Sequence, residues 1–458
     1  MIMTDESFKT WYEENQEGIQ EDFFKFLSFP SISTDPQYKP AILETAKWLK
    51  DYLQEIGLEA EIWETSSYPV VFGSYLKAGK DRPTVLLYHH YDVQPVDPLE
   101  LWDSEPFKPT VRNNKVYARG AVDNKGQCFY SITALKAFLS LADKANLNIK
   151  VFIEGEEESG GSGTFEAIRM KKEALRADHL LIVDLGIPAP DVPGMELGTR
   201  GIVALHAEFS NSSVDLHSGA HGGIALNPNR AMVKVLSELW DGEGKVAVPG
   251  FYDDVVSLSK DELSHLDMDF DRERYKKDFG VNAFAPEKGY SLTESNWIRP
   301  TLEINGISGG YTGMGFKTVI PSKAIAKISC RLVLDQDPNK VVASIESFLR
   351  SRLPNGIQLR IEKYQGVKAF RTPHNAKIVK ICAEAFEEVF GKKCLFQMTG
   401  GSIPIIPDLK EASGADVALI GVGLGTDDIH APNEHFGLDR FEKGYLVISK
   451  ILTKLANI

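Results

Sequence analysis

Thr84-Val-Leu-Leu-Tyr-His-His-Tyr-Asp92 decides the fold: an apolar run of the length of one buried strand is followed at once by polar side chains. Residues 148–153 are a second such run and lead into Glu154-Gly-Glu-Glu-Glu158, and residues 179–183 lead into Asp184. Open parallel sheets bind their ligands beyond the carboxyl ends of their strands. The sequence therefore predicts a site where these three polar clusters meet.

Helical patterns separate the strands and extend the α/β interpretation along the chain. They lie at residues 6–27, 42–56, 127–142 and 163–175. Strands that alternate with helices are typical of an open sheet covered on both faces. We therefore predict an α/β fold with a mostly parallel central sheet flanked by helices.

The rhythm of the chain changes near Gly198 and returns near Pro373, which predicts an interrupted domain. Between these points strand patterns dominate, at residues 201–209, 301–304, 324–334 and 357–364, with helical patterns at 229–240 and 339–353 and a charged stretch at 261–277. Afterwards come a helix at 376–390, strands near Leu395 and Val417, and a closing helix from Phe441. We predict a catalytic domain of residues 1–198 and 371–458, and an inserted α+β domain with an antiparallel sheet at residues 199–370.

Composition restricts the class of protein. With 458 residues, 43% hydrophobic and 25% charged, the chain is long enough for two well-packed domains. A net charge of −13 argues against nucleic-acid binding, which needs a concentrated basic surface. The four cysteines have no short Cys-x-x-Cys spacing, the N-terminus carries no apolar leader, and no apolar run approaches the ~18 residues of a membrane helix. We expect a cytoplasmic protein with reduced thiols and no membrane partner.

The polar clusters contain the residue types of a metal-dependent hydrolase. Such a site needs histidine and carboxylate ligands, a carboxylate shared by two ions, and a further carboxylate that takes a proton from water. The candidates, in chain order, are His90 and Asp92, Asp123 in Gly120-Ala-Val-Asp-Asn-Lys-Gly126, the run Glu156-Glu157-Glu158, Asp184, and His430.

Each candidate has an ordinary alternative. His90 and His430 alone are compatible with core or loop histidines, and Asp123 with a helix cap. A run of three glutamates is most often a solvated surface. Only the order and spacing of the five clusters favour the metal site.

Together, His90-x-Asp92, Gly120-Ala-Val-Asp123, Glu157-Glu158-Ser-Gly160, Asp184 and His430 resemble the dinuclear zinc peptidases. That family includes carnosinases, bacterial dipeptidases, glutamate carboxypeptidase, aminoacylase, acetylornithine deacetylase and succinyl-diaminopimelate desuccinylase. His90-Tyr-Asp-Val-Gln-Pro95, Asp215-Leu-His-Ser-Gly219 and Gly400-Gly-Ser-Ile-Pro404 are similar to its carnosinase-like dipeptidase branch.

The resemblance implies two zinc ions per subunit, with manganese or cobalt as alternatives. One ion would be held by His90 and Asp184, the second by Glu158 and His430, and Asp123 would bridge them. Glu157 matches the general base of the family, and Asp92 matches the carboxylate that supports the metal-binding histidine.

The resemblance also implies that the inserted domain mediates a homodimer. His217 matches a histidine that reaches the partner's active site, where it would polarise the scissile carbonyl; read alone, His217 is a loop histidine, and whether it acts in its own subunit or in the partner's stays open.

Four further residues are candidates for substrate contacts. Arg331 suits a substrate carboxylate through its planar guanidinium group, although a surface arginine explains it as well. Ser402 and Gly401 in the Gly-Gly-Ser loop, and His374, are the other three. The sequence departs from the branch at Met398-Thr399, where Arg-Glu is usual, so recognition of a free amino end through that position is in doubt. It also departs at Asn124, where many members have aspartate.

We therefore expect metal-dependent hydrolysis of the peptide bond of dipeptides or short peptides with a free C-terminal carboxylate, by a water activated between two zinc ions, with Glu157 as general base. The alternative enzyme is an N-acyl amino acid or acyl-diamine amidohydrolase (deacylase) that uses the same site. A non-catalytic binding protein that has kept the fold is the alternative from another class.

Overall fold

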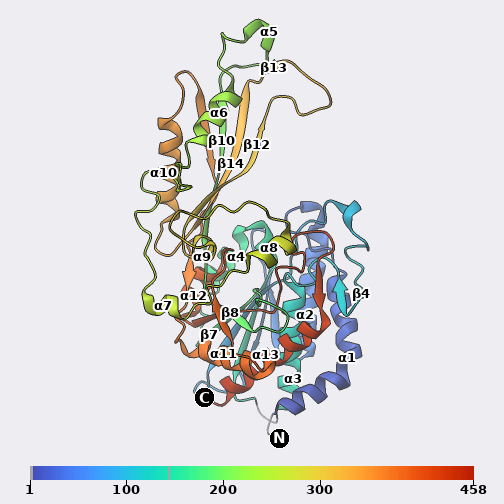
Figure 1. The fold of residues 1–458 in the computed structure, drawn as a ribbon. Helices are drawn as coiled ribbons and strands as arrows, with labels where there is room; N and C mark the ends of the chain where they lie inside the picture. The colour runs from blue at the N-terminus through green and yellow to red at the C-terminus, as the bar shows by residue number, and fades with distance from the viewer. Residues whose placement is uncertain (1–3, 143–144) are drawn as a thin grey trace.

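An eight-stranded mixed sheet, the large sheet, forms the base of the molecule in the computed structural model, which describes residues 4–142 and 145–458 (Figure 1). Four adjacent strands at its centre run parallel, and the strands outside them include antiparallel pairs. The order across the sheet is β1 (Glu59–Trp63), β2 (Val70–Tyr75), β6 (Asn148–Glu154), β3 (Thr84–His90), β7 (His179–Val183), β18 (Asp416–Ile420), β8 (Gly194–Glu196) and β17 (Leu395–Gln397). The predicted mostly parallel central sheet is confirmed.

Helices cover both faces of the large sheet, and β3 shows why. Its side chains alternate: Val85 and Leu87 belong to the apolar core on one face, whereas Leu86 and Tyr88 belong to the core on the other. The first core also holds apolar residues of α1 (Asp5–Leu27), α2 (Lys39–Glu55), α3 (Lys125–Leu141), α11 (Lys377–Phe390) and α13 (Leu438–Ala456). The second holds those of α4 (Ser162–Met170) and α12 (Ile406–Ser413).

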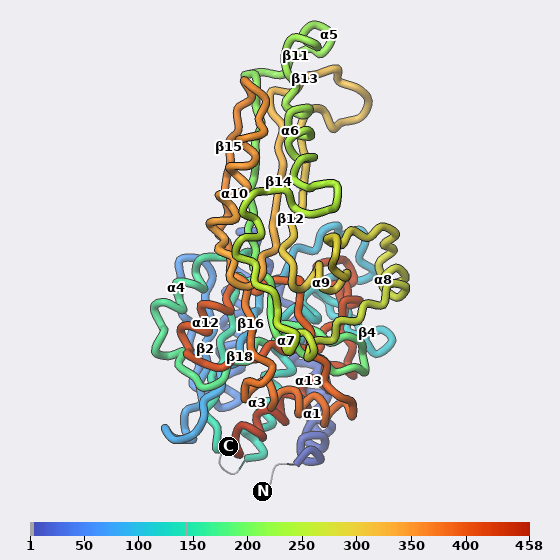
Figure 2. The backbone as a smooth tube through the Cα atoms, turned by 60° about the vertical axis from the view of Figure 1, so that its left-hand side comes forward, coloured from blue at the N-terminus to red at the C-terminus, as the bar shows by residue number. Residues whose placement is uncertain are grey.

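A four-stranded antiparallel sheet, the projecting sheet, rises from this base (Figures 1 and 2). Its order is β12 (Thr301–Gly309), β14 (Lys323–Leu332), β10 (Gly201–Ser210) and β15 (Gln358–Lys363). Every second residue of β10 is buried, which is the pattern of a sheet covered on one face. The covering helices are α6 (Pro228–Ser237) and α10 (Pro338–Ser351), which share a separate apolar core with the sheet.

At the far end of the projecting sheet lie the short strands β11 (Leu216–His217) and β13 (Val319–Ile320) with α5 (Ser218–His221) (Figures 1 and 2). At the near end, β9 (Gly198–Thr199) pairs with β16 (Phe370–Arg371), where the chain leaves the base and returns to it.

The charged stretch inside the inserted segment does not stay with the projecting sheet. Its helices α7 (Lys260–Ser264), α8 (Arg272–Phe279) and α9 (Leu292–Trp297) lie beside the base in both views (Figures 1 and 2). The backbone N–H of Asp267 donates to the carbonyl of Phe396, in β17, at 2.7 Å. This segment therefore forms part of the surroundings of the site described below.

The remaining elements are short. They are the sheet β19 (His435–Gly437), β5 (Lys115–Tyr117) and β4 (Thr110–Arg112), and the 3-10 turns η1 (Pro36–Tyr38), η2 (Leu99–Leu101) and η3 (Glu157–Ser159). Cys128, Cys330, Cys382 and Cys394 are buried and unpaired, as expected. Across residues 4–142 and 145–458, none of the helices combines the length and apolarity needed to cross a membrane.

Candidate active site and metal centre

The polar clusters singled out in the sequence meet at one edge of the large sheet. Because β3, β6 and β7 are parallel neighbours, their carboxyl ends lie side by side. His90 ends β3, η3 follows β6, and Asp184 follows β7. Asp123 comes from the loop before α3 and His430 from the loop between β18 and β19.

Asp123 lies between two histidines. The Nε2 atom of His90 is 3.0 Å from Oδ1 of Asp123, and Nε2 of His430 is 2.9 Å from Oδ2. Asp184 is 3.6 Å from His90, and Glu158 is 3.3 Å from His430. The result is two groups of three potential ligands that share one carboxylate, and within each group the donor atoms lie within 4.8 Å of one another.

The backbone of His430 adopts a conformation that is unusual for a residue other than glycine. Its φ of 61° lies in the left-handed region, which costs a residue other than glycine roughly 1 kcal/mol or more. Such a conformation persists only where the surrounding loop enforces it, and here it turns the imidazole toward Asp123.

Negative charge dominates the site. Burial and the nearby Asp123 carboxylate raise the pKa of Glu158 to about 7. Burial, with the carboxylates of Glu158, Asp184 and Asp123, also raises the pKa of Glu157 well above its usual value. The neighbouring carboxylates of Asp123 and Glu158 raise the pKa of His430 to about 10. Burial and neighbouring carboxylates thus disfavour the ionised forms of Glu157 and Glu158.

The donor set fits divalent cations. Imidazole nitrogen and carboxylate oxygen are the ligands of catalytic zinc sites. In addition, Oε1 of Glu158 is buried and lies 3.3 Å from His430 Nε2, without a well-aligned hydrogen bond within the described part of the chain. A buried carboxylate oxygen of this kind beside a shared carboxylate is the arrangement expected of a ligand.

Asp92 holds the site together in a way that the sequence did not fully predict. His90 Nδ1 lies 3.0 Å from the backbone carbonyl of Asp92 and 3.4 Å from its carboxylate. The same carboxylate accepts hydrogen bonds from the backbone N–H groups of Glu157 and Glu158 and from the Ser33 hydroxyl. Asp92 thus positions both His90 and the glutamate turn.

A cavity of about 410 Å³ opens over this cluster. Its lining includes Asp123, Glu157, Glu158, Asp184 and His430, together with Glu196, Gln397, Thr399, Gly401, Ser402 and Ile403. Arg331 of β14 contacts this lining from behind Ser402, because its Nη1 donates to Ser402 Oγ at 2.8 Å. The cavity therefore combines the anionic cluster with a serine that is held by an arginine.

Comparison with known proteins decides the family. The model of the peptidase family M20/M25/M40 matches residues 86–454. The chain belongs to this peptidase family. The resemblance stated from the motifs is confirmed, and the M20 peptidase is a metal-dependent hydrolase.

Individual relatives agree over nearly the whole chain. The Cys-Gly metallodipeptidase dug1 of Schizosaccharomyces pombe is 30% identical, over 94% of each chain. The M20 family metallo-carboxypeptidase Sso-CP2 from Sulfolobus solfataricus has a TM-score of 0.88 and 31% identity, over 96% of this chain and 99% of its own. Human carnosine dipeptidase 1 has a TM-score of 0.85 and 27% identity, over 99% and 98%.

Two of the candidate residues of the M20 peptidase lie elsewhere. His217 is exposed at the far end of the projecting sheet, and its Nδ1 accepts a hydrogen bond from the backbone N–H of Gly219. Figure 1 places this end away from the edge of the large sheet that carries the cavity. Within its own subunit, His217 does not join the cluster.

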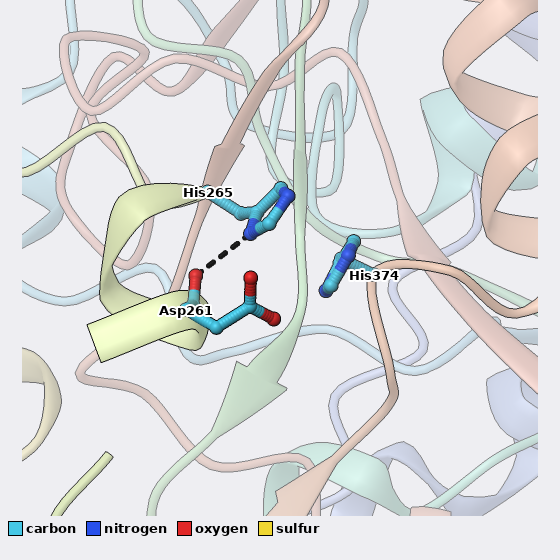
Figure 3. A group of neighbouring side chains, drawn as sticks. All are labelled: Asp261, His265 and His374. Carbon is cyan, nitrogen blue, oxygen red and sulfur yellow. Dashed lines mark hydrogen bonds between the residues drawn. The ribbon is translucent and has the colours of Figure 1, made fainter. Parts of the chain in front are cut away.

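His374 lines a second cavity, and Asp261 and His265 lie next to it (Figure 3). The rings of His374 and His265 stack with centroids 3.8 Å apart and planes 17° apart. Stacked rings direct their nitrogen lone pairs side by side rather than toward a common point, which is not the geometry of two ligands on one ion. The ring of His374 packs on His265 and is not among the residues that line the main cavity, and its contact with substrate stays a prediction.

Two residues position the site in ways that were not predicted from the sequence. Asn124 Nδ2 donates to the carbonyl of Val183 at 2.9 Å and to the carboxylate of Asp184, so the departure from aspartate at this position has a structural use. Arg200 donates to the carbonyl of Gly400 and to Asn296 Oδ1, which fixes the Gly-Gly-Ser loop against the inserted segment.

Glu434 is a further positioning residue, and its side chain makes four hydrogen bonds. Its buried carboxylate accepts hydrogen bonds from the backbone N–H groups of Gly120, Val122 and Asp123 and from Arg119 Nη1. This one side chain therefore shapes the loop that presents Asp123. Its signal in the sequence is only an acid four residues after His430.

Replacing Glu434 with glutamine is expected to destabilise the protein by about 3–5 kcal/mol, because Arg119 loses its buried counter-charge. Glutamine also has a single oxygen for the three backbone donors. Urea denaturation measures the effect. The matched control is Glu411→Gln, since Glu411 is exposed and pairs only with Lys172 at the surface, where an ion pair contributes under about 1 kcal/mol. Equal stability of the two variants would contradict the role assigned to Glu434.

Proposed function

We propose that the M20 peptidase is a two-zinc dipeptidase that cleaves the peptide bond of a short peptide with a free C-terminal carboxylate. The carboxylate of Asp123, shared between His90 and His430, is the observation that carries this proposal. The relatives support it, since one is named as a Cys-Gly metallodipeptidase, one as a carnosine dipeptidase and one as a metallo-carboxypeptidase. These names do not favour the deacylase alternative.

In this proposal His90, Asp184 and Asp123 hold one ion, and Asp123, Glu158 and His430 hold the other. Zinc suits the imidazole and carboxylate donors, and manganese or cobalt can take the same ligands. Two such ions supply the positive charge that lowers the pKa of water toward neutrality and polarises the substrate carbonyl.

Glu157 acts as the general base. Its carboxylate oxygen lies within 4.8 Å of donor atoms of His90 and Glu158, and Asp92 fixes its backbone. A carboxylate with a raised pKa takes a proton from the attacking water and keeps it long enough to pass it to the leaving nitrogen. Neighbouring negative charge therefore prepares Glu157 for both transfers.

Arg331 and Ser402 orient the substrate through its C-terminal carboxylate. The Ser402 hydroxyl hydrogen-bonds to the Arg200 carbonyl and accepts from Arg331, so the donor pair is held in place before substrate arrives. A planar guanidinium binds a carboxylate with two parallel hydrogen bonds. The Gly401 backbone lines the same cavity.

Residues 199–370 form the inserted unit through which we propose a homodimer. Met314 and Phe316, near the far end of the projecting sheet, are almost fully exposed, with relative exposures of 97% and 102%. Apolar side chains exposed in this way are typical of an interaction surface. His217 lies at the same end, and in the dimer it would donate to the oxyanion that forms in the partner's site.

A substrate panel tests the proposal. Dipeptides, N-acetyl amino acids and N-succinyl amino acids are assayed after loading with zinc, manganese or cobalt. We expect dipeptide hydrolysis that a chelator abolishes and added metal restores. Preference for an acylated amino acid would favour the deacylase, and metal binding without turnover would favour a non-catalytic protein.

Mixing two inactive variants tests the placement of His217. In a mixture of His217→Ala and Glu157→Gln subunits, each heterodimer has one site that combines an intact Glu157 with the intact His217 of the other chain. Random exchange of subunits then restores about one quarter of wild-type activity. If His217 served its own subunit, both sites of the heterodimer would stay inactive and the mixture would show no recovery.

A further inference from the structure

A carboxylate that belongs to neither ligand group lines the same cavity as the metal cluster. Glu196 ends β8, between β18 and β17, with Gln397 as its neighbour on β17. It lines the same cavity as Asp123, Glu157 and Asp184. It is absent from every group of potential metal ligands among the described residues.

Among the residues that the structure describes, Glu196 has no partner of opposite charge. Its Oε2 atom is buried and makes no hydrogen bond to any described residue. Burial, together with the Asp184 carboxylate, raises the pKa of Glu196 to about 8. No lysine or arginine is found among the described residues that line the cavity, and His430 is committed to Asp123 and Glu158.

A buried carboxylate without a partner costs free energy, and a ligand cation is the remedy that the cavity leaves open. In the proposed function, the other groups of a dipeptide already have partners. The scissile bond lies at the metal cluster, and the C-terminal carboxylate binds to Ser402 and Arg331. The one remaining charge of a dipeptide is its α-ammonium group. Its chemistry is that of the missing partner.

Thr399 cannot provide a carboxylate for the ammonium group of the substrate, whereas Glu196 can. Thr399 lines the cavity, but its hydroxyl accepts a hydrogen bond from the backbone N–H of Gly401. The backbone N–H of Thr399 donates to the carbonyl of Gly198, two residues beyond Glu196, so the two positions lie near each other in the cavity lining. Glu196 is thus a carboxylate available close to the position where the sequence left recognition of an amino end in doubt.

We propose that Glu196 binds the free α-amino group of the substrate and makes the enzyme select unblocked dipeptides over N-acyl amino acids. The inference rests on the proposed dipeptidase function and names the residue that sets its specificity. Glu196 forms an ion pair with the ammonium group and takes no part in proton transfer. Its effect should therefore appear in substrate selection, not in the chemistry of the metal cluster.

Alanylglycine and propionylglycine test the proposal, because they differ only in the ammonium group. With zinc loaded, the wild type should prefer alanylglycine in kcat/KM. Glu196→Gln should lower kcat/KM for alanylglycine about 10- to 100-fold, the range for a hydrogen bond to a charged group. Hydrolysis of propionylglycine should stay within about threefold of the wild type, since that substrate makes no such bond.

Zinc content and thermal unfolding serve as controls in the same experiment. Both should match the wild-type values, because glutamine keeps the shape of Glu196 and because Glu196 belongs to neither group of potential ligands. Equal losses on both substrates, or an unchanged preference for alanylglycine, would overturn the role of Glu196 while leaving the dipeptidase function intact. Wild-type enzyme that hydrolyses neither substrate would overturn the dipeptidase function and this inference with it.

Discussion

Glu157→Gln is expected to lower kcat by about 10³-fold or more while the protein keeps its metal, since a positioned general base contributes about 10²–10⁴-fold. Glutamine has nearly the same shape as glutamate but cannot accept the proton of the attacking water. It also cannot deliver a proton to the leaving nitrogen, so both halves of the reaction are affected. Metal analysis and steady-state kinetics on one dipeptide measure the two quantities.

Glu158→Gln is the matched control for this experiment, because it makes the same chemical change one residue later. The buried Oε1 atom of Glu158 lies 3.3 Å from His430 Nε2, within one of the two ligand groups. Replacing Glu158 should therefore lower metal content together with activity. A Glu157→Gln variant that loses metal to the same extent would show that Glu157 is a ligand. Retention of more than about one tenth of wild-type kcat would show that another group takes the proton.

Asp123→Asn should reduce the metal content from two ions per subunit to one or none and abolish turnover. Each oxygen of Asp123 faces a different histidine, and asparagine keeps only one of them, without charge. We expect metal affinity to fall by more than about 10²-fold, the upper end of the cost of losing a residue that merely supports a ligand. Metal content after dialysis against graded chelator gives the affinity.

The control for Asp123 is Asp191→Asn, which makes the same substitution at an exposed carboxylate paired with Lys443. That variant should keep both ions and full activity. If Asp123→Asn also bound two ions with wild-type affinity, the shared-carboxylate interpretation of the site would be wrong, whatever happened to turnover.

The buried strands could be predicted because their apolar side chains are consecutive. β3, β6 and β7 each combine such a run with a polar residue at the carboxyl end, and parallel pairing then brings those ends together. The meeting of His90, Asp184 and the glutamate turn follows from this rule. Strands β1 and β2 were not predicted. For β1, with the sequence Glu-Ala-Glu-Ile-Trp, the reason is that charged residues are exposed at the edge of the sheet.

Residues that act through long-range hydrogen bonds could not be predicted. Glu434 shapes the Asp123 loop although it lies more than 300 positions away, and nothing in its local sequence marks it. The same holds for Glu196, whose proposed role depends on the lack of a cationic partner among the described residues. The packing of α7 to α9 beside the base also could not be predicted from the sequence, because a charged stretch does not indicate which part of the molecule it contacts.

The hydrogen bond between Arg331 and Ser402 joins a strand of the projecting sheet to a loop of the base. Any ligand anion held by this pair touches both parts of the molecule at once. Occupancy and the relative orientation of the two parts are then thermodynamically linked, and each biases the other by the same free energy. Recognition of the peptide's end thus also acts as a restraint on the angle of the projecting sheet, and with it on the reach of the histidine at its tip.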